Sequence, residues 1–234
     1  MFNVPSASAA TLSGIDFRVA TPAAGFCQQL FDTFDREDGQ RDPSLCKAIL
    51  RFPNGTIFWS SKMAIDADGV AAGPGRRCGT QLDPSDGQND TSFHFPDGSP
   101  LSSERHPFIV LPLGVFRAAT GLSVGDLAVV IYRDLLTAAI CGDLGPSHKI
   151  GEGSIRLHEA FHPPAPDPCS VRNPDGSCRR IHDASIEEDV LFFVFPGSAI
   201  GSALTFDNAE MLIKTRAYAL FAQLHNPVSQ PAIA

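Results

Sequence analysis

The 234-residue sequence lacks a long hydrophobic run: none approaches the roughly 20 apolar residues that a transmembrane helix needs. It also lacks an excess of positive charge, because 18 Lys and Arg stand against 26 Asp and Glu, for a formal net charge of −8. An acidic chain argues against a nucleic-acid partner, which calls for a basic surface. We therefore expect neither a membrane nor a nucleic acid among its partners.

Internal repeats, interdomain linkers and C-x-x-C pairs are also missing. Without C-x-x-C spacing, the cysteines are not arranged as structural zinc ligands usually are. The composition, 43% hydrophobic and 19% charged, is that of an ordinary globular protein long enough to bury a full core. We expect residues 1–24, rich in Ala, Ser, Thr and Pro, to form a flexible N-terminal arm, and residues 25–234 to form a single, monomeric domain.

The N-terminal residues Met1 to Leu12 lack both a basic residue and an apolar core of about 7–15 residues, so they do not form an intact signal peptide. Two explanations remain: the protein stays in the cell, or it is secreted and its signal peptide has been removed. An even number of cysteines favours disulfides and an oxidising compartment, and therefore secretion. The six cysteines are Cys27, Cys46, Cys78, Cys141, Cys169 and Cys178.

Two of these cysteines, Cys169 and Cys178, enclose the strong turn sequence Asn-Pro-Asp-Gly within an insertion near residues 163–185. We predict a bridge between them and take Cys27 with Cys46 as a second candidate pair. Because six cysteines allow many full pairings, the connectivity stays open.

Short apolar runs bounded by turn residues predict strands over residues 108–113, 126–132, 135–141 and 189–195. A hairpin is predicted over residues 48–60, with Asn-Gly in its turn. Helices are predicted over residues 151–162, where prolines end the pattern, and 207–224, with Asp207 as N-cap. The sequence therefore predicts a mainly β domain with flanking helices and a long polar loop over residues 69–106.

Two carboxylates flank a polar loop in the middle of the chain. An apolar run ends at Asp143, and the Gly- and Pro-containing loop then leads to Glu152 at the start of the predicted helix. Hydrolysis of a glycosidic bond needs such a pair, because one group protonates the leaving oxygen while the other activates water or attacks the sugar. The alternative is a turn Asp and a helix-start Glu with no catalytic role. Desolvation favours Asp143 as the acid and the helix dipole favours Glu152 as the base, but the assignment stays open.

The segment Gly142–Ser154, GDLGPSHKIGEGS, resembles the core signature of glycoside hydrolase family 75, the chitosanases of fungi and bacteria. Further segments resemble the family in the same order, over roughly residues 47–224: Phe58–Gly69, Thr91–Phe93, Pro107–Pro112, Val124–Ile131 and Phe193–Ser198. The resemblance implies a six-stranded double-psi β-barrel and an endo-acting hydrolase without cofactor or metal. Its substrate would be chitosan, a β-1,4-linked glucosamine polymer, cleaved with inversion.

The resemblance also implies the site residues. Asp143 and Glu152 would be catalytic, with their carboxyls about 6.5–9.5 Å apart for an inverting mechanism. Substrate-binding residues would be Asp66, Asp68, Thr91, Ser92, His148, Lys149 and Ser154. Asp66 and Asp68 would pair with glucosamine ammonium groups, a turn or a bound cation being the alternative. An EF-hand is excluded, because Arg77 stands where its loop requires Glu. An acidic surface would attract a cationic polymer.

This sequence departs from the family pattern at Cys141 and in the insertion that carries Cys169 and Cys178. On a regular strand, Cys141 would share the face of Asp143, two residues later.

A competing motif, H-E-x-x-H, spans His158 to His162. On a helix its two histidines share a face and bind zinc, and its Glu acts as the base of a metallopeptidase. Two prolines directly after His162 and the missing third ligand count against this alternative. A further alternative is a non-catalytic polysaccharide-binding barrel, against which the presence of both Asp143 and Glu152 counts.

Overall fold

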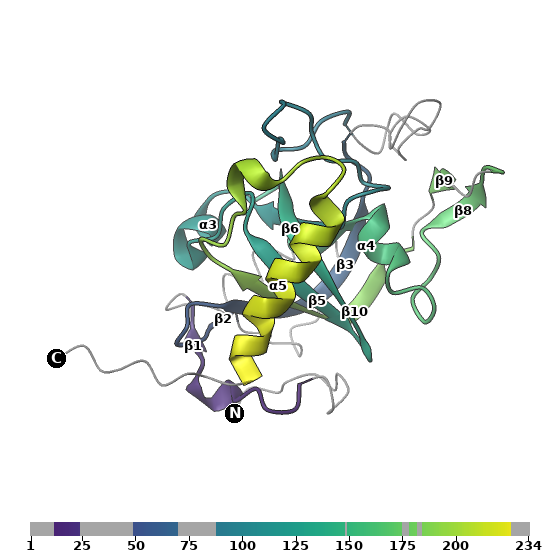
Figure 1. Ribbon diagram of the computed structural model, residues 1–234. Coiled ribbons are helices and arrows are strands. Elements are labelled where there is room, and N and C mark those ends of the chain that lie inside the picture. Colours follow the sequence, from purple (N-terminus) through teal and green to yellow (C-terminus); the bar gives the residue numbers. More distant parts are fainter. Residues whose placement is uncertain are drawn as a thin grey trace.

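The computed structural model describes residues 12–23, 49–69, 88–147, 149–174, 178–181 and 184–225. A closed six-stranded barrel forms its centre, because the last strand of an eight-stranded sheet also pairs with the third strand in the sheet order (Figure 1). The barrel strands, in spatial order, are β3 (Ile57–Asp66), β10 (Ile186–Phe195), β5 (Leu127–Tyr132), β6 (Leu135–Gly145), β4 (Phe108–Pro112) and β7 (Glu152–Ser154). The predicted mainly β, barrel-like domain with flanking helices is confirmed.

Two pairings in this barrel, β3 with β7 and β4 with β6, are parallel, whereas the other neighbours are antiparallel. Parallel neighbours cannot be joined by a tight hairpin, so the chain must cross the barrel between them. Strand β7 follows β6 in the sequence but lies between β3 and β4. This crossing brings residues far apart in the sequence to adjacent strands.

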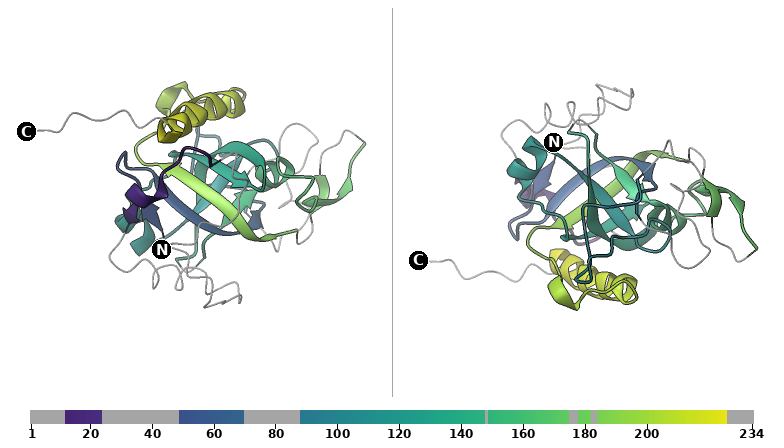
Figure 2. Two further views of the ribbon diagram at one scale, coloured as in Figure 1. Left: turned by 90° about the horizontal axis from the view of Figure 1, so that it is seen from below. Right: turned by 90° about the horizontal axis from the view of Figure 1, so that it is seen from above.

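The remaining elements surround the barrel. The short strands β1 (Thr21–Pro22) and β2 (Leu50–Arg51) extend the sheet beyond β3, and β8 (Cys169–Arg172) pairs with β9 (Cys178–Ile181) in a separate two-stranded sheet. Figure 2 shows that this second sheet stands away from the barrel. The helices are η1 (Phe17–Val19), α3 (Val115–Thr120), α4 (Ile155–Glu159), η3 (Gly201–Ala203) and α5 (Ala209–His225).

The barrel strands alternate between two apolar clusters, as the two-residue period of a strand requires. One cluster fills the barrel and contains Trp59 stacked on Phe192, with ring centroids 5.1 Å apart. The other covers the outer face beneath α5, where Phe221 packs against Phe193. Each such buried side chain contributes about 1.5–3 kcal/mol. Trp59, the only tryptophan, therefore belongs to the core.

The helix predicted over residues 151–162 is shorter than expected. Residues Glu152–Ser154 form strand β7, and α4 begins only at Ile155, with the hydroxyl of Ser154 as its N-cap acceptor. The cause is non-local: β3 pairs with this segment in parallel, Ala64 opposite Glu152. Glu152 thus lies on a strand, and the prediction that a helix dipole stabilises its carboxylate is wrong.

Residues 12–23, predicted as part of a flexible arm, are attached to the barrel. Strand β1 pairs with β2, and the ring of Phe17 lies 5.0 Å from that of Phe58 and 5.5 Å from that of Phe52. The apolar side chains in this stretch explain the correction, because packing them removes their surface from water. The limits of the arm and of the domain otherwise stay a prediction.

The last helix begins two residues later than predicted, at Ala209. The carboxylate of Asp207 accepts a hydrogen bond from Arg105 (2.8 Å). The side chain of Asn208 instead accepts from the backbone of Thr205 in the turn before the helix.

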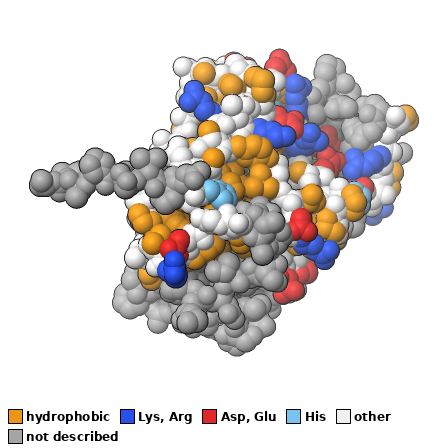
Figure 3. Space-filling view, turned by 60° about the horizontal axis from the view of Figure 1, so that its bottom comes forward, with side chains coloured by type: hydrophobic (Ala, Val, Ile, Leu, Met, Phe, Trp, Pro, Cys, Tyr) orange, Lys and Arg blue, Asp and Glu red, His pale blue; other side chains and the backbone are white. Residues whose placement is uncertain are grey.

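The molecular surface mixes charges of both signs. On the face shown in Figure 3, Lys and Arg side chains lie beside Asp and Glu side chains and between apolar patches. The acidic excess of the chain is therefore not gathered on this face. Within the described residues, none of the helices has the length and apolar character needed to cross a bilayer.

Candidate active site

Three carboxylates, Asp66, Asp143 and Glu152, come from β3, β6 and β7, three of the four strands that follow one another around this side of the barrel. Residues paired in register share a face of the sheet. Glu152 lies opposite Ala64 on β3, and Asp143 lies opposite Val110 on β4. Val110 belongs to the apolar cluster outside the barrel, which indicates that Asp143 points outward as well. The site is therefore built on the outer face of β3, β7, β4 and β6, beside the part of that face that α5 covers.

A β-bulge aims Asp143 outward. Ile109 pairs with Cys141 and the next residue, Val110, pairs with Asp143, so Gly142 is an extra residue in β6. Cys141 packs with the cluster inside the barrel and is a free, buried thiol. The prediction that Cys141 shares the face of Asp143 is therefore wrong, because the bulge shifts the alternation by one residue. Bulges commonly re-aim a side chain next to active sites.

The carboxylates line a cleft of about 380 Å³. Four of its eleven lining residues are acidic, and Lys149 is the one cationic residue among those that the structure describes there. The lining residues are Ile65, Asp66, Asp68, Gln88, Val110, Asp143, Leu144, Gly145, Pro146, Lys149 and Glu152. The cleft is thus suited to a polar ligand that carries positive charge.

Three hydrogen bonds converge on one oxygen of Asp143. Its Oδ1 accepts hydrogen bonds from the backbone N–H of Ser92 (2.9 Å), the hydroxyl of Ser92 (2.5 Å) and the backbone N–H of Leu144 (2.7 Å). Three donors on Oδ1 fix the orientation of the carboxyl group. Asp143 is only 7% exposed, so this orientation is maintained in a mostly dry environment.

Glu152 is paired with a cation from the preceding loop. The Nζ of Lys149 lies 2.6 Å from its Oε1, and the Glu152 side chain is 10% exposed. A charge-assisted contact this short stabilises the carboxylate form. The backbone of Gly145 provides the space, since a Cβ at that position would lie 3.0 Å from Oε2 of Glu152.

Asp66 and Asp68 lie at the end of β3, where the backbone N–H of Asp68 donates to Oδ1 of Asp66 (2.7 Å). The backbone N–H of Gln88 donates to Oδ1 of Asp68 (2.6 Å). Burial, followed by repulsion from Asp68, Glu152 and Asp143, raises the pKa of Asp66 well above its usual value. Burial is also the main cause that raises the pKa of Asp68 to about 6, with repulsion from Asp143 and Glu152 adding to it. A positive charge placed beside Asp66 and Asp68 would therefore lower their pKa values again.

One oxygen each from Asp66, Asp68 and Asp143 lies within 4.8 Å of the other two. A positive charge placed between them, an ammonium group or a cation, would relieve their mutual repulsion.

The residues predicted from the sequence fall into three groups. Asp66, Asp68, Lys149 and the two predicted catalytic acids line the cleft together. Ser92 acts on Asp143 rather than lining the cleft, and His148 lies outside the described residues.

Thr91 and Ser154 form the third group, whose hydroxyls are used inside the protein. The Thr91 hydroxyl donates to the carbonyl of Phe93 and accepts from the N–H of Leu101. The Ser154 hydroxyl donates to the carbonyl of His106, and Ser154 is fully buried. Neither residue is among those that line the cleft.

Sequence reasoning missed Gln88, Val110 and Gly145 as lining residues. Gly145 belongs to the Gly-Pro pair of the signature segment, which was a signal for a close backbone approach. Val110 and Gln88 gave no such signal, because their position depends on strand pairing and on a loop that returns to the end of β3.

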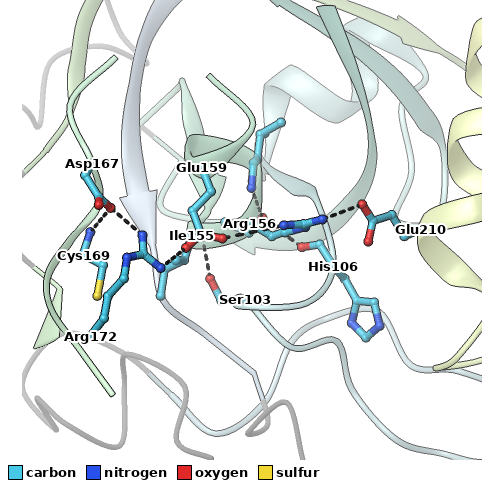
Figure 4. A network of polar contacts seen from close by, with 11 residues as sticks. Ser103, His106, Ile155, Arg156, Glu159, Asp167, Cys169, Arg172 and Glu210 are labelled. Atoms are coloured by element: carbon cyan, nitrogen blue, oxygen red, sulfur yellow. Dashed lines mark hydrogen bonds and ion pairs between the residues drawn. The ribbon is translucent and has the colours of Figure 1, made fainter. Parts of the chain in front are cut away.

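The H-E-x-x-H segment is not arranged as a zinc site. His158 is fully buried, and both its ring nitrogens lie 3.0 Å from backbone carbonyl oxygens, those of Ser154 and Met63. Glu159 binds the guanidinium of Arg172 (2.9 Å), as Figure 4 shows. These contacts occupy a histidine that would bind zinc and the glutamate that would activate the zinc-bound water. The structure therefore does not favour the metallopeptidase alternative.

The predicted bridge between Cys169 and Cys178 stays a prediction, because the side chain of Cys178 lies outside what the structure describes. The backbone register sets Ile181 opposite Cys169, and Cys178 opposite Arg172. The second candidate pair, Cys27 and Cys46, also lies outside the described residues.

Comparison with protein families finds one match. The model of the family described as fungal chitosanase of glycosyl hydrolase group 75 matches residues 63–222, which is more than half of the chain. The matched range includes every residue that lines the cleft. A comparison with curated proteins finds no match.

Proposed function

Since the chain belongs to glycosyl hydrolase group 75, the fungal chitosanase family, we propose that it is an endo-acting chitosanase that hydrolyses β-1,4-linked glucosamine polymers. One observation carries the proposal: Asp143 and Glu152 lie in the same acidic cleft and are held by different strands, each with its own set of contacts. Two separately positioned carboxyls are the machinery of most glycoside hydrolases.

We assign Asp143 as general acid and Glu152 as general base. As general acid, Asp143 would transfer a proton to the glycosidic oxygen as the bond from C1 to that oxygen breaks. The Lys149 ammonium keeps Glu152 ionised, ready to take a proton from the water that attacks C1. Attack from the opposite side of the ring inverts C1, so the two carboxyls are expected about 6.5–9.5 Å apart.

Asp66 and Asp68 would bind the ammonium groups of glucosamine units. An ammonium group placed near them offsets the repulsion among the four cleft carboxylates, which a neutral N-acetyl group does not do. Deacetylated polymer is therefore the proposed substrate, and the steps above use only side chains and water. We propose secretion and a monomeric enzyme, in line with the cysteine content and the extracellular occurrence of the polymer.

The decisive experiment measures reducing ends and product size from chitosan for wild type, Asp143→Asn and Glu152→Gln. We expect short oligomers from wild type and an activity loss of about 10³-fold in each variant. Glu159→Gln is the matched control, because Glu159 is paired with arginines outside the cleft and should retain activity.

Other results would point elsewhere. A wild-type protein that binds chitosan but releases no reducing ends is a binding barrel and not a hydrolase. Loss of activity in Glu159→Gln, with both cleft variants active, would contradict the assignment of Asp143 and Glu152 as the catalytic residues. Nuclear magnetic resonance of the first-formed anomer tests inversion separately.

A further inference from the structure

The turn before β4, residues 102–106, touches the ends of two acid-bearing strands through one side chain. Ser103 is fully buried, and its hydroxyl donates to the backbone carbonyl of Asp66 (2.5 Å). The same hydroxyl accepts a hydrogen bond from the backbone N–H of Ile155 (2.9 Å). Ser103 thus joins the last residue of β3 to the first residue of α4, which directly follows β7.

A third contact fixes the direction of this link. The carbonyl of Ser103 accepts a hydrogen bond from the backbone N–H of Arg156 (2.8 Å). The hydroxyl and the carbonyl of Ser103 therefore both face the start of α4. Figure 4 shows Ser103 facing the chain at Ile155 and Arg156. The two N–H donors belong to the first turn of the helix, where backbone donors have no partner within the helix.

The position of the link matters because the ladder between the strands stops there. Asp66 opposite Ser154 is the last pair of the β3–β7 ladder. Two of the four cleft carboxylates stand two residues from that pair: Glu152 lies before Ser154, within the ladder, and Asp68 lies after Asp66, beyond it. Beyond it the β3–β7 ladder does not continue, and the segment that carries Asp68 is held by other contacts, among them the bridge between Gly69 and Ser102.

We propose that Ser103 is a positioning residue for chitosan hydrolysis, its hydroxyl fixing the spacing between the Asp66–Asp68 segment and Glu152. The proposal rests on the proposed function for its kinetic test. Ser103 does not line the cleft, so it acts through the backbone of these segments and not on the substrate.

The turn that presents Ser103 is itself fixed. The Nδ1 of His106 accepts the backbone N–H of Ser102 (2.9 Å), and its Nε2 donates to the carbonyl of Phe206 (2.9 Å). Burial lowers the pKa of His106 to about 4, so this arrangement of one acceptor and one donor persists above that pH. The Ser103 hydroxyl is thus held in place by a rigid frame.

The neighbouring Ser102 is a matched control. It is as deeply buried as Ser103, but within the described part of the chain its hydroxyl has no hydrogen-bond partner. Ser102→Ala therefore removes the same atom from the same turn without removing a hydrogen bond. Ser103→Thr keeps the hydroxyl and tests whether that group, and not the size of the side chain, is responsible.

The experiment compares kcat and KM on chitosan oligomers for wild type, Ser103→Ala, Ser103→Thr and Ser102→Ala, far below their melting temperatures. We expect Ser103→Ala to lower kcat about 10- to 100-fold, since small misplacements of catalytic groups have effects of this size, with KM little changed. Ser103→Thr should recover most of kcat, and Ser102→Ala should match wild type. A kcat of Ser103→Ala equal to wild type, whatever its melting temperature, overturns the proposal.

A second measurement does not depend on activity. Amide hydrogen exchange at Ile155 should accelerate in Ser103→Ala and stay unchanged in Ser102→Ala, because only the first loses the acceptor. Unchanged protection at Ile155 in both variants overturns the positioning role. Inactivity of the wild type on chitosan would instead overturn the proposed function, and the exchange data would still decide whether Ser103 joins the two segments.

Discussion

Gly145 lines the cleft at a point with little room for added volume. A Cβ there would lie 3.0 Å from both Oε2 of Glu152 and Cγ1 of Val110, closer than side chains normally approach. We expect Gly145→Ala to push the Glu152 carboxyl away from Lys149 and lower kcat about 10- to 100-fold. Kinetics on chitosan together with a thermal melt check this. Full activity would mean that the Glu152 carboxyl does not depend on this space.

Substitutions of Lys149 test whether its positive charge, and not its size, supports Glu152. Removing its ammonium in Lys149→Met leaves Glu152 without its 2.6 Å partner and favours protonation of the base. We expect kcat/KM to fall at least about tenfold and the acidic limb of its pH profile to move to higher pH. Lys149→Arg keeps a positive charge and is the control. A Met variant with an unchanged pH profile would contradict the assignment of Glu152 as base.

At the scale of elements, α5 stabilises the barrel without contributing to the cleft. Phe221 is 6% exposed and its ring lies 5.1 Å from that of Phe193 on β10. We expect Phe221→Ala to lower the free energy of unfolding by about 3 kcal/mol, measured by denaturant titration, while kcat below the transition stays near wild type. Met211→Ala on the same helix, where the side chain is 62% exposed, should change stability little.

Individual elements differ in how far the sequence predicts them. Strand β5 is a continuous apolar run and was predicted almost to its ends. Strand β7 was not, because Glu-Gly-Ser carries no strand pattern and becomes a strand only when β3 pairs with it from far along the chain. The bulge at Gly142 was invisible for the same reason, since register is set by the partner strand.

For the site, residue types and their order were enough to place Asp143 and Glu152 in one cleft together with Asp66 and Asp68. Their orientations were not predictable, because they follow from the bulge and the parallel pairing. Hydroxyls in the signature segments were overestimated as ligands: the hydroxyl of Ser154 is used to cap α4. Short polar side chains next to a helix start often serve the backbone in this way.

At the scale of the whole molecule, the cleft acids couple stability to pH. The folded-state pKa of Asp68, about 6, is above its unfolded value near 3.8, so its favourable contribution is present below the unfolded value and is lost as pH rises through 6. We expect Asp68→Asn to raise the melting temperature by a few degrees at pH 8 and by little at pH 3.5, after allowance for solvent screening. The exposed Asp134→Asn is the control. Equal shifts at both pH values would contradict the prediction.

The separate sheet of β8 and β9 shares no ladder with the barrel among the described strands. The Arg172 guanidinium anchors it, binding Glu159 on α4 and Asp167 at the base of the hairpin. A segment tied on by ion pairs is free to change length without moving the register of any barrel strand. We therefore expect this hairpin to accept a peptide tag or a second module while the register of the barrel strands stays unchanged.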